Sequence, residues 1–195
     1  MKFTKIPADT FKNVQMNAGV LLTEFDPKTA SLELANIIGA TSGGISFAAT
    51  PTYKDMGEDI DNCPKNTKEL KRLESMDIKM SGTFATVTAE SAKMLNAHAD
   101  VDESDASHIV PRTDIEDEDF TDLWWVGDYS DENGEQNGGL CAIHMMNALS
   151  TGGFKIQSED KGKGKLAFEF TAHFSIADQT KVPYEVFVKT GTAEA

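Results

Sequence analysis

The chain has 195 residues, 39% of them hydrophobic and 26% charged, which predicts a single globular domain spanning residues 1–195. Its formal net charge is −14, and the acidic run from Asp100 to Glu135 contains 14 acidic residues and one basic residue, Arg112. Because nucleic-acid affinity comes mainly from Lys and Arg, this balance argues against tight, direct nucleic-acid binding. Two interpretations of the acidic run remain: a solvated loop that keeps the protein soluble, or a surface that repels a polyanion.

The sequence shows neither the pattern of a membrane span nor that of a signal peptide. No apolar run is long enough to span a bilayer, and the start, MKFTKIPADTFKN, lacks the apolar stretch of a signal peptide. These features predict a protein made in the cytoplasm without membrane contact. Cys63 and Cys141 are far apart in sequence, and we expect both to be free thiols.

Most of the chain has the patterns of β-strands. Apolar residues alternate with polar ones most clearly in KLAFEFTAHFSI, which predicts that Leu166, Phe168, Phe170, Ala172, Phe174 and Ile176 share one buried face. Gly82 interrupts a similar face and predicts a bulge or a close neighbour. The predicted strands, in chain order, are Val14–Phe25, Ile37–Tyr53, Met76–Phe84, Leu123–Tyr129, Gly139–Ala148, Phe154–Gln157, Leu166–Ile176 and Tyr184–Lys189.

Helical patterns are few. Thr88 followed by AESAKMLNAHA predicts a helix of about three turns with Thr88 as the N-cap and Ala92, Met94 and Leu95 facing inward. The segment Asn66–Ser75 predicts a shorter helix. The polar, non-periodic KDMGEDIDNCPK, residues 54–65, predicts a long functional loop. Together these elements predict an antiparallel β-sandwich or β-barrel with one flanking α-helix and a long inter-strand loop.

Two similar glycine motifs stand apart in the chain, TSGGISF at 41–47 and STGGFKI at 150–156. A phosphate-binding loop needs a Lys at fixed spacing and a following helix, and both motifs lack these features. Gly43, Gly44, Gly152 and Gly153 are therefore predicted to begin strands or to form bulges.

No pattern of catalytic or ligand-binding residues is specific. The segment SDENGEQNGG lacks the spacing of a calcium loop, and its Asn133-Gly134 and Asn137-Gly138 pairs predict a hairpin turn. The four histidines form no metal-binding spacing, and no strained-nucleophile motif is present. We expect no catalytic residue, cofactor or metal. Trp124 and Trp125 should face opposite sides of a strand, one in the core and the other free to stack on a sugar or join an interface.

Five long strings carry a resemblance to a known family: EDIDNCPKNTKEL, DIKMSGTFATVT, LWWVGDYSDENG, AIHMMNALSTGGF and SEDKGKGKLAFEFTAHFS. With them, the chain resembles the major tail proteins, or tail tube proteins, of long-tailed bacteriophages that infect Gram-positive bacteria. The resemblance extends from ADTFKN near the start to VPYEVFVKTGT near the end.

The resemblance implies a structural virion protein. It implies hexameric rings that stack into a tail tube, through which double-stranded DNA passes without specific binding. The implied partners are other copies of the chain and the tail terminator, tape measure and distal tail or initiator proteins. Assembly would take place in the host cytoplasm and end in the virion tail.

The resemblance also assigns roles to two sets of residues. The long loop at residues 54–75 is expected to contact the next ring or subunit, through Met56, Glu58, Asp59, Asp61, Asn62, Cys63 and Pro64. Gly43, Gly44, Gly152 and Gly153 are expected at the rims where strands of adjacent subunits pair edge to edge.

Other functions remain open at this stage. The tube could belong to a phage-derived particle without DNA. The chain could instead be a soluble ligand- or carbohydrate-binding β-sandwich that stacks ligands on Trp124, Trp125 and Tyr129. A third possibility is an acidic DNA mimic that binds a basic partner. An enzyme has the least support.

Overall fold

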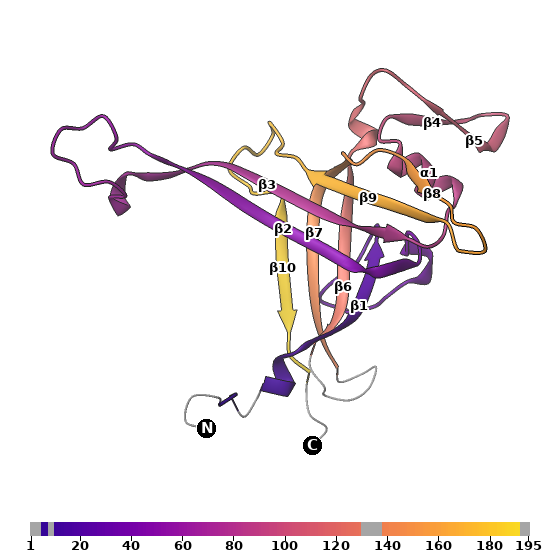
Figure 1. The fold of residues 1–195 in the computed structure, drawn as a ribbon, viewed down its shortest axis with the longest axis horizontal. Helices are drawn as coiled ribbons and strands as arrows, with labels where there is room; N and C mark the ends of the chain where they lie inside the picture. Colours follow the sequence, from indigo (N-terminus) through magenta and orange to yellow (C-terminus); the bar gives the residue numbers. More distant parts are fainter. Residues whose placement is uncertain (1–4, 8–9, 130–137, 192–195) are drawn as a thin grey trace.

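The computed structural model describes residues 5–7, 10–129 and 138–191. One continuous antiparallel sheet of eight strands folds over on itself, and the strands of its two layers cross (Figure 1). The last residues of β7 pair with the last residues of β9 and join the layers. The predicted class, mainly β with a sandwich and one flanking helix, is confirmed.

The first layer contains β1 (Gln15–Leu22), β6 (Thr121–Tyr129), β7 (Gly139–Ser150) and β10 (Tyr184–Lys189). The second contains β2 (Thr41–Asp55), β3 (Lys71–Phe84), β8 (Lys155–Gln157) and β9 (Lys165–Ala172). Outside the sandwich lie the helix α1 (Ala89–Leu95) and a two-stranded ribbon of β4 (Ala99–Asp102) and β5 (Asp105–Pro111). Short 3₁₀ turns occur at Thr10–Asn13, Leu34–Asn36, Lys68–Leu70 and Asp117–Asp119.

The main core lies between the layers and follows from the period-2 pattern of the strands. Leu166, Phe168, Phe170 and Ala172 of β9 are all buried, as predicted. The other members of this cluster are Leu21, Ile38, Ile78, Met80, Phe84, Leu95, Leu123, Met145 and Ala148. A Cβ on Gly82 would lie 2.7 Å from Phe168 Cζ, which confirms the predicted close neighbour. Each buried aromatic or aliphatic side chain here contributes about 1.5–3 kcal/mol relative to exposure.

A second, smaller core covers the other face of the first layer. Leu22, Trp124, Leu140 and Ala142 pack there against side chains that include Phe25 and Ile37, from the segment between β1 and β2. The central strands of the first layer, β6 and β7, are therefore covered on both faces, whereas the second layer has one open face. This difference explains why the apolar residues of β7 form a nearly continuous run.

The helix begins as predicted and ends early. Thr88 Oγ1 accepts a hydrogen bond from Ser91 N and the Ser91 side chain accepts one from Thr88 N, which completes a capping box. Ala92 and Leu95 are buried, as expected. The helix has seven residues and about two turns rather than three, because the Asn96 amide donates to Ala92 O and Ala97 adopts a left-handed φ of 64°.

Three predictions about elements are wrong. Asn66–Ser75 is not a helix: β3 begins at Lys71, because antiparallel pairing with β2 overrides the local pattern, and only Lys68–Leu70 forms a helical turn. The strand β9 ends at Ala172, so Phe174 and Ile176 are exposed. The acidic segment after α1 is not a simple loop, since it forms the β4–β5 ribbon.

The hairpin between β6 and β7 is confirmed by their pairing from Tyr129↔Gly139 onward. Its predicted turn residues Asn133, Gly134 and Asn137 lie outside the described residues, and Gly138 is the first described residue after them.

Phe170 and Phe174 belong to the same alternating segment, KLAFEFTAHFSI, and allow a matched stability test. Phe170→Ala should lower the free energy of unfolding by about 3–5 kcal/mol, because it leaves a cavity in the main core. Phe174→Ala should cost much less, about 0.5 kcal/mol, because Phe174 is 46% exposed and belongs to neither core. Urea denaturation of the unassembled protein measures both, and equal losses would contradict the observed end of β9.

Candidate functional site

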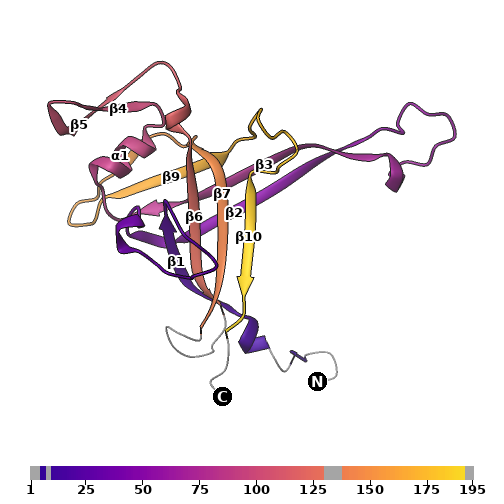
Figure 2. The same ribbon diagram turned by 180° about the vertical axis from the view of Figure 1, so that it is seen from behind.

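The β2–β3 hairpin projects far from the sandwich, as both views show (Figures 1 and 2). The two strands pair from Thr41↔Phe84 to Asp55↔Lys71. The third strand, β9, pairs with β3 only from Lys79 to Phe84, so residues 71–78 have β2 as their only strand partner. Ile78 and Met76 still contact the main core, so the part of β3 without core contact is residues 71–75, about 17 Å long at about 3.4 Å per residue.

The end of the hairpin, residues 56–70, is held by its own hydrogen bonds. The carboxylate of Asp55 accepts hydrogen bonds from Gly57 N at 3.0 Å and from Asn66 N at 2.7 Å. Lys71 Nζ donates a hydrogen bond to Asn66 Oδ1 at 2.7 Å. A Cβ on Gly57 would come within 2.9 Å of both Leu70 Cδ1 and Cys63 Sγ, so a larger residue there would require these two side chains to shift. Hydrogen bonds from the backbone of Gly57 and Asn66 lower the pKa of Asp55.

Large apolar side chains are exposed along this hairpin. Tyr53, Met56, Ile60 and Leu73 are 47–56% exposed, and none belongs to either core. Contiguous exposed apolar residues commonly mark an interaction surface. The hairpin therefore has the shape and composition of an arm that another molecule covers.

The residues predicted to make subunit contacts lie on this arm. Met56, Glu58, Asp59, Asp61, Asn62, Cys63 and Pro64 all fall in the connection between β2 and β3, and all but Cys63 are exposed. Their contact with another subunit stays a prediction. Sequence analysis missed the flanking Tyr53 and Leu73 and the Asp55 hydrogen bonds. The Asp-x-Gly spacing of 55–57 was an available turn signal.

The two glycine pairs have different structural roles. Gly43 and Gly44 have φ values of +80° and +83° and lie where the β2–β3 register shifts, at the start of an edge strand. Gly152 and Gly153 lie in the turn between β7 and β8. There, Thr151 N and Gly152 N donate to Glu169 O, and Gly153 has a φ of +68°. The expected role of all four at a subunit rim stays a prediction.

Four strands of the large sheet have an unpaired edge within the described residues. β1 pairs only with β6, β2 only with β3, β8 only with β9, and β10 only with β7. Val186 and Val188 of β10 are more than half exposed. Unpaired edges offer rows of backbone donors and acceptors to another strand.

The described part of the acidic run is organised around Arg112. Its guanidinium lies 2.8 Å from Asp100, 2.7 Å from Asp119 and 3.2 Å from Glu116. Burial opposes the charge on this group, but the three carboxylates outweigh it and raise the pKa of Arg112. The described part of the run is therefore folded: it contains the β4–β5 ribbon, a segment that Arg112 links to Asp100, and strand β6. Residues 130–137 lie outside the described part of the chain.

The tryptophans do not form an open stacking platform. They face opposite sides of β6, as predicted: Trp124 is buried in the smaller core and Trp125 packs against the main core. The ring of His144 stacks on Trp124 at 4.0 Å between centroids, and Trp125 Nε1 donates to Ala18 O. The geometry leaves neither indole with an evident site for a sugar ring.

Polar groups near these aromatics satisfy one another. His144 Nε2 lies 2.9 Å from Asp122 Oδ2, and its Nδ1 lies 3.8 Å from Glu185 Oε2. Both ring nitrogens of His144 therefore lie near carboxylates. In the described ranges, no three His, Cys, Asp or Glu residues are grouped to hold a metal ion.

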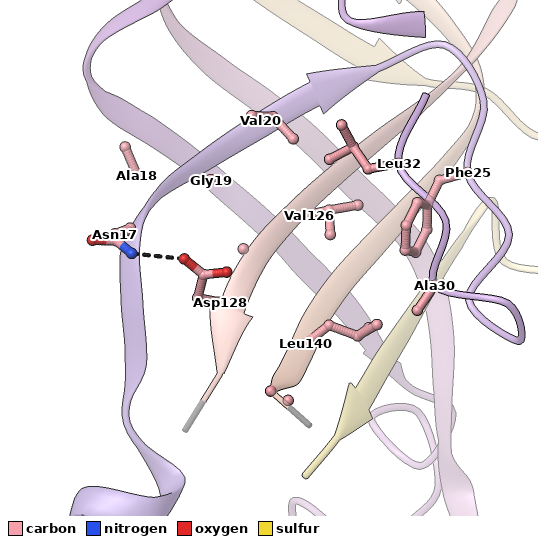
Figure 3. Close-up of a pocket in the computed structure, with 13 residues that line it drawn as sticks. Asn17, Ala18, Gly19, Val20, Phe25, Ala30, Leu32, Val126, Asp128 and Leu140 are labelled. Atoms are coloured by element: carbon pink, nitrogen blue, oxygen red, sulfur yellow. Dashed lines mark hydrogen bonds between the residues drawn. The ribbon is translucent and has the colours of Figure 1, made fainter. Parts of the chain in front are cut away.

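An open hollow of about 430 Å³ lies beside β1, β6 and β7 (Figure 3). Its apolar lining includes Val20, Phe25, Leu32, Val126 and Leu140. The labelled polar pair in it is Asn17 and Asp128, which hydrogen-bond to each other at 2.6 Å. A ligand site usually presents several convergent polar groups, so this hollow does not indicate a particular ligand.

Comparison with known proteins leaves the family open. No model of a known protein family matches the sequence, and a search of curated proteins found no match. The resemblance to tail tube proteins therefore stays a prediction. None of the helices seen in the described residues is long and apolar enough to cross a membrane.

The hairpin end should respond to acid through Asp55. Its pKa is lowered in the folded protein, so the stabilisation is present above the unfolded value near 3.9 and is lost as pH falls through the lower folded value. The amide signals of Gly57 and Asn66 in the unassembled protein should titrate with a midpoint below 3.8 in NMR spectra. A midpoint at or above that value, or no titration of either amide, would contradict the hydrogen bonds described.

Proposed function

We propose that this protein is a structural subunit that assembles with its own copies into stacked rings, forming the tail tube of a bacteriophage. The observation that carries the proposal is the projecting β2–β3 arm, with an ordered end and exposed apolar residues. A monomer gains nothing from such an arm, because its outer part adds no side chain to either core. A second molecule could bury it.

The unpaired strand edges support ring formation. β2 and β10 lie in different layers, and each has one edge free of a strand partner among the described residues. Strands of neighbouring copies could extend the sheet across subunits through backbone hydrogen bonds. The glycine bulge at 43–44 gives β2 an edge without side chains at its start.

The open face of the second layer suits the wall of a DNA channel. It carries many short side chains with hydroxyl groups: Ser46, Thr50, Thr52, Ser75, Ser81, Thr83 and Thr171. Its charged residues include Lys79, paired with Asp77 at 3.3 Å, Lys165, paired with Glu159 at 3.2 Å, and Glu169 and Lys155. Since phosphate binding depends on available Lys and Arg, a face with most of its lysines paired would attract DNA only weakly. Screening limits repulsion by carboxylates to about 8–10 Å at cellular salt.

In this role the protein is assembled in the host cytoplasm and ends in the virion tail. The tail terminator, tape measure and initiator proteins would be the other partners of the tube. A phage-derived particle without DNA would use the same assembly. No observation in the described residues favours the ligand-binding or DNA-mimic alternatives over this one.

Removing the end of the arm tests the proposal. Residues 56–70 are replaced by Asn-Gly, which can close the Asp55↔Lys71 pair as a two-residue hairpin turn. The purified wild-type protein should form rings or tubes in negative-stain electron microscopy, with sonicated tubes as seeds where needed. The shortened variant should stay unassembled, because it lacks the end of the arm with the exposed Met56 and Ile60.

A second trimmed variant controls for the loss of a loop. Replacing residues 158–164 with Asn-Gly closes the Gln157↔Lys165 pair of β8 and β9 in the same way and should leave tube formation unchanged. Both variants should melt within a few degrees of wild type. Normal tubes from the variant without residues 56–70, or a wild-type protein that stays monomeric with every seed, would contradict the proposal.

A further inference from the structure

The ladder of the arm is interrupted close to the sandwich. Thr52 pairs with Ser75, and the next residue of β2, Tyr53, pairs with Leu73, so Glu74 of β3 has no partner on β2. The pairs keep one register from this point to the end of the arm and another register toward the sandwich. An extra residue of this kind is a β-bulge, which disrupts the ladder and bends its strand.

Side chains give the ladder no support around the bulge. Residues 51–54 of β2 and 72–75 of β3 are all exposed, and Met76 is the last residue of β3 that contacts the main core. In the described part of the chain, no side-chain hydrogen bond or ion pair joins these two stretches, and the first one toward the end of the arm comes from Asp55. Backbone hydrogen bonds alone therefore join the strands here, and Pro51 supplies no N–H group.

The parts on both sides of the bulge are held more firmly. The outer unit, residues 53–73, contains the hydrogen bonds of the Asp55 carboxylate, and Met56 N donates to Leu70 O at 3.0 Å. On the inner side, Ile78 is fully buried and β9 adds a third strand. A two-stranded ladder by itself is only marginally stable in water. The exposed stretch is therefore the weakest connection between two ordered bodies.

From this arrangement we infer that the arm is hinged at the bulge. The outer unit swings as one body relative to the sandwich, and residues 51–54 and 72–75 take up the change in backbone torsion angles. Hinges of this kind are short stretches that absorb large φ/ψ changes between rigid bodies. Figures 1 and 2 show the two strands leaving the sandwich with no other segment beside them, so no described segment blocks the swing.

The hinge goes beyond the proposed function, because it concerns the motion of the arm within a single copy. In the proposed tube, it would let a contact made by the arm persist while neighbouring rings tilt. In a free subunit, it would let the end of the arm sample several directions before a partner covers it.

Residual dipolar couplings of the unassembled wild-type protein test the hinge. The backbone N–H couplings of β6, β7 and β9 define the alignment of the sandwich, from which the couplings of the outer unit are calculated. We expect the measured couplings of residues 53–73 to be smaller than calculated by about half or more, because hinge motions occur within microseconds to milliseconds and average them. They should still fit one alignment tensor of their own, since the outer unit moves as a body.

Deleting Glu74 should remove the hinge. The deletion leaves the pairs Thr52↔Ser75 and Tyr53↔Leu73 in place and makes the ladder continuous. The couplings of the outer unit should then agree with the alignment of the sandwich. Glu74→Ala keeps the extra residue, so it is the matched control and should behave like wild type. Circular dichroism and the amide signals of β9 verify that both variants fold.

Three results would overturn the hinge. Wild-type couplings of both bodies that fit one alignment would show a rigid arm. Couplings of the outer unit that fit no single alignment would show local disorder rather than a swinging body. Reduced couplings that persist in the folded deletion variant would place the motion elsewhere. If the deletion variant does not fold, the wild-type couplings decide alone.

The test is independent of assembly. Because no step needs tubes, a rigid or locally disordered arm would leave the proposed function standing. A hinged arm in a protein that never forms tubes would support the hinge and overturn the proposed function.

Discussion

The antiparallel pairing of β2 with β3 is the constraint on which the rest of the structure depends. At its inner end, Ile78, Met80 and Phe84 are fully buried, and β9 adds a third strand. At its outer end, the same ladder continues without a core beneath it. The ladder reaches the end of the arm with one register shift, between Thr52 and Tyr53, so the paired strands carry the arm outward from the core without a third strand.

The arm is also stabilised locally where the strands stop. Asp55 bridges the start and the finish of the turn by accepting from Gly57 and Asn66. A carboxylate that accepts two backbone N–H groups keeps its charge and its position. The exposed apolar residues are consequently held on a defined scaffold, which lowers the entropy lost when a partner covers them.

Negative charge is concentrated in one part of the fold. Residues 100–119 carry nine carboxylates and one arginine, whereas the hairpin segment 54–75 carries six carboxylates and five cations. The single Arg112 holds the acidic ribbon in place by engaging three carboxylates from different parts of it.

Local patterns in the sequence determined the mainly β class, most strands, and the Thr88 cap. They also determined the buried face of β9 as far as Ala172. These features depend on side-chain periodicity and capping, which involve near neighbours in the chain. The local patterns were wrong for Asn66–Ser75, Phe174 and Ile176, and they gave no sign of the β4–β5 ribbon. Only the tertiary structure decided that β3 extends to Lys71, that two similar Gly-Gly motifs become a bulge and a turn, and that Trp124 lies beneath His144. The physical reason is that pairing and burial depend on partners distant in sequence, whose hydrogen bonds and packing outweigh local preference.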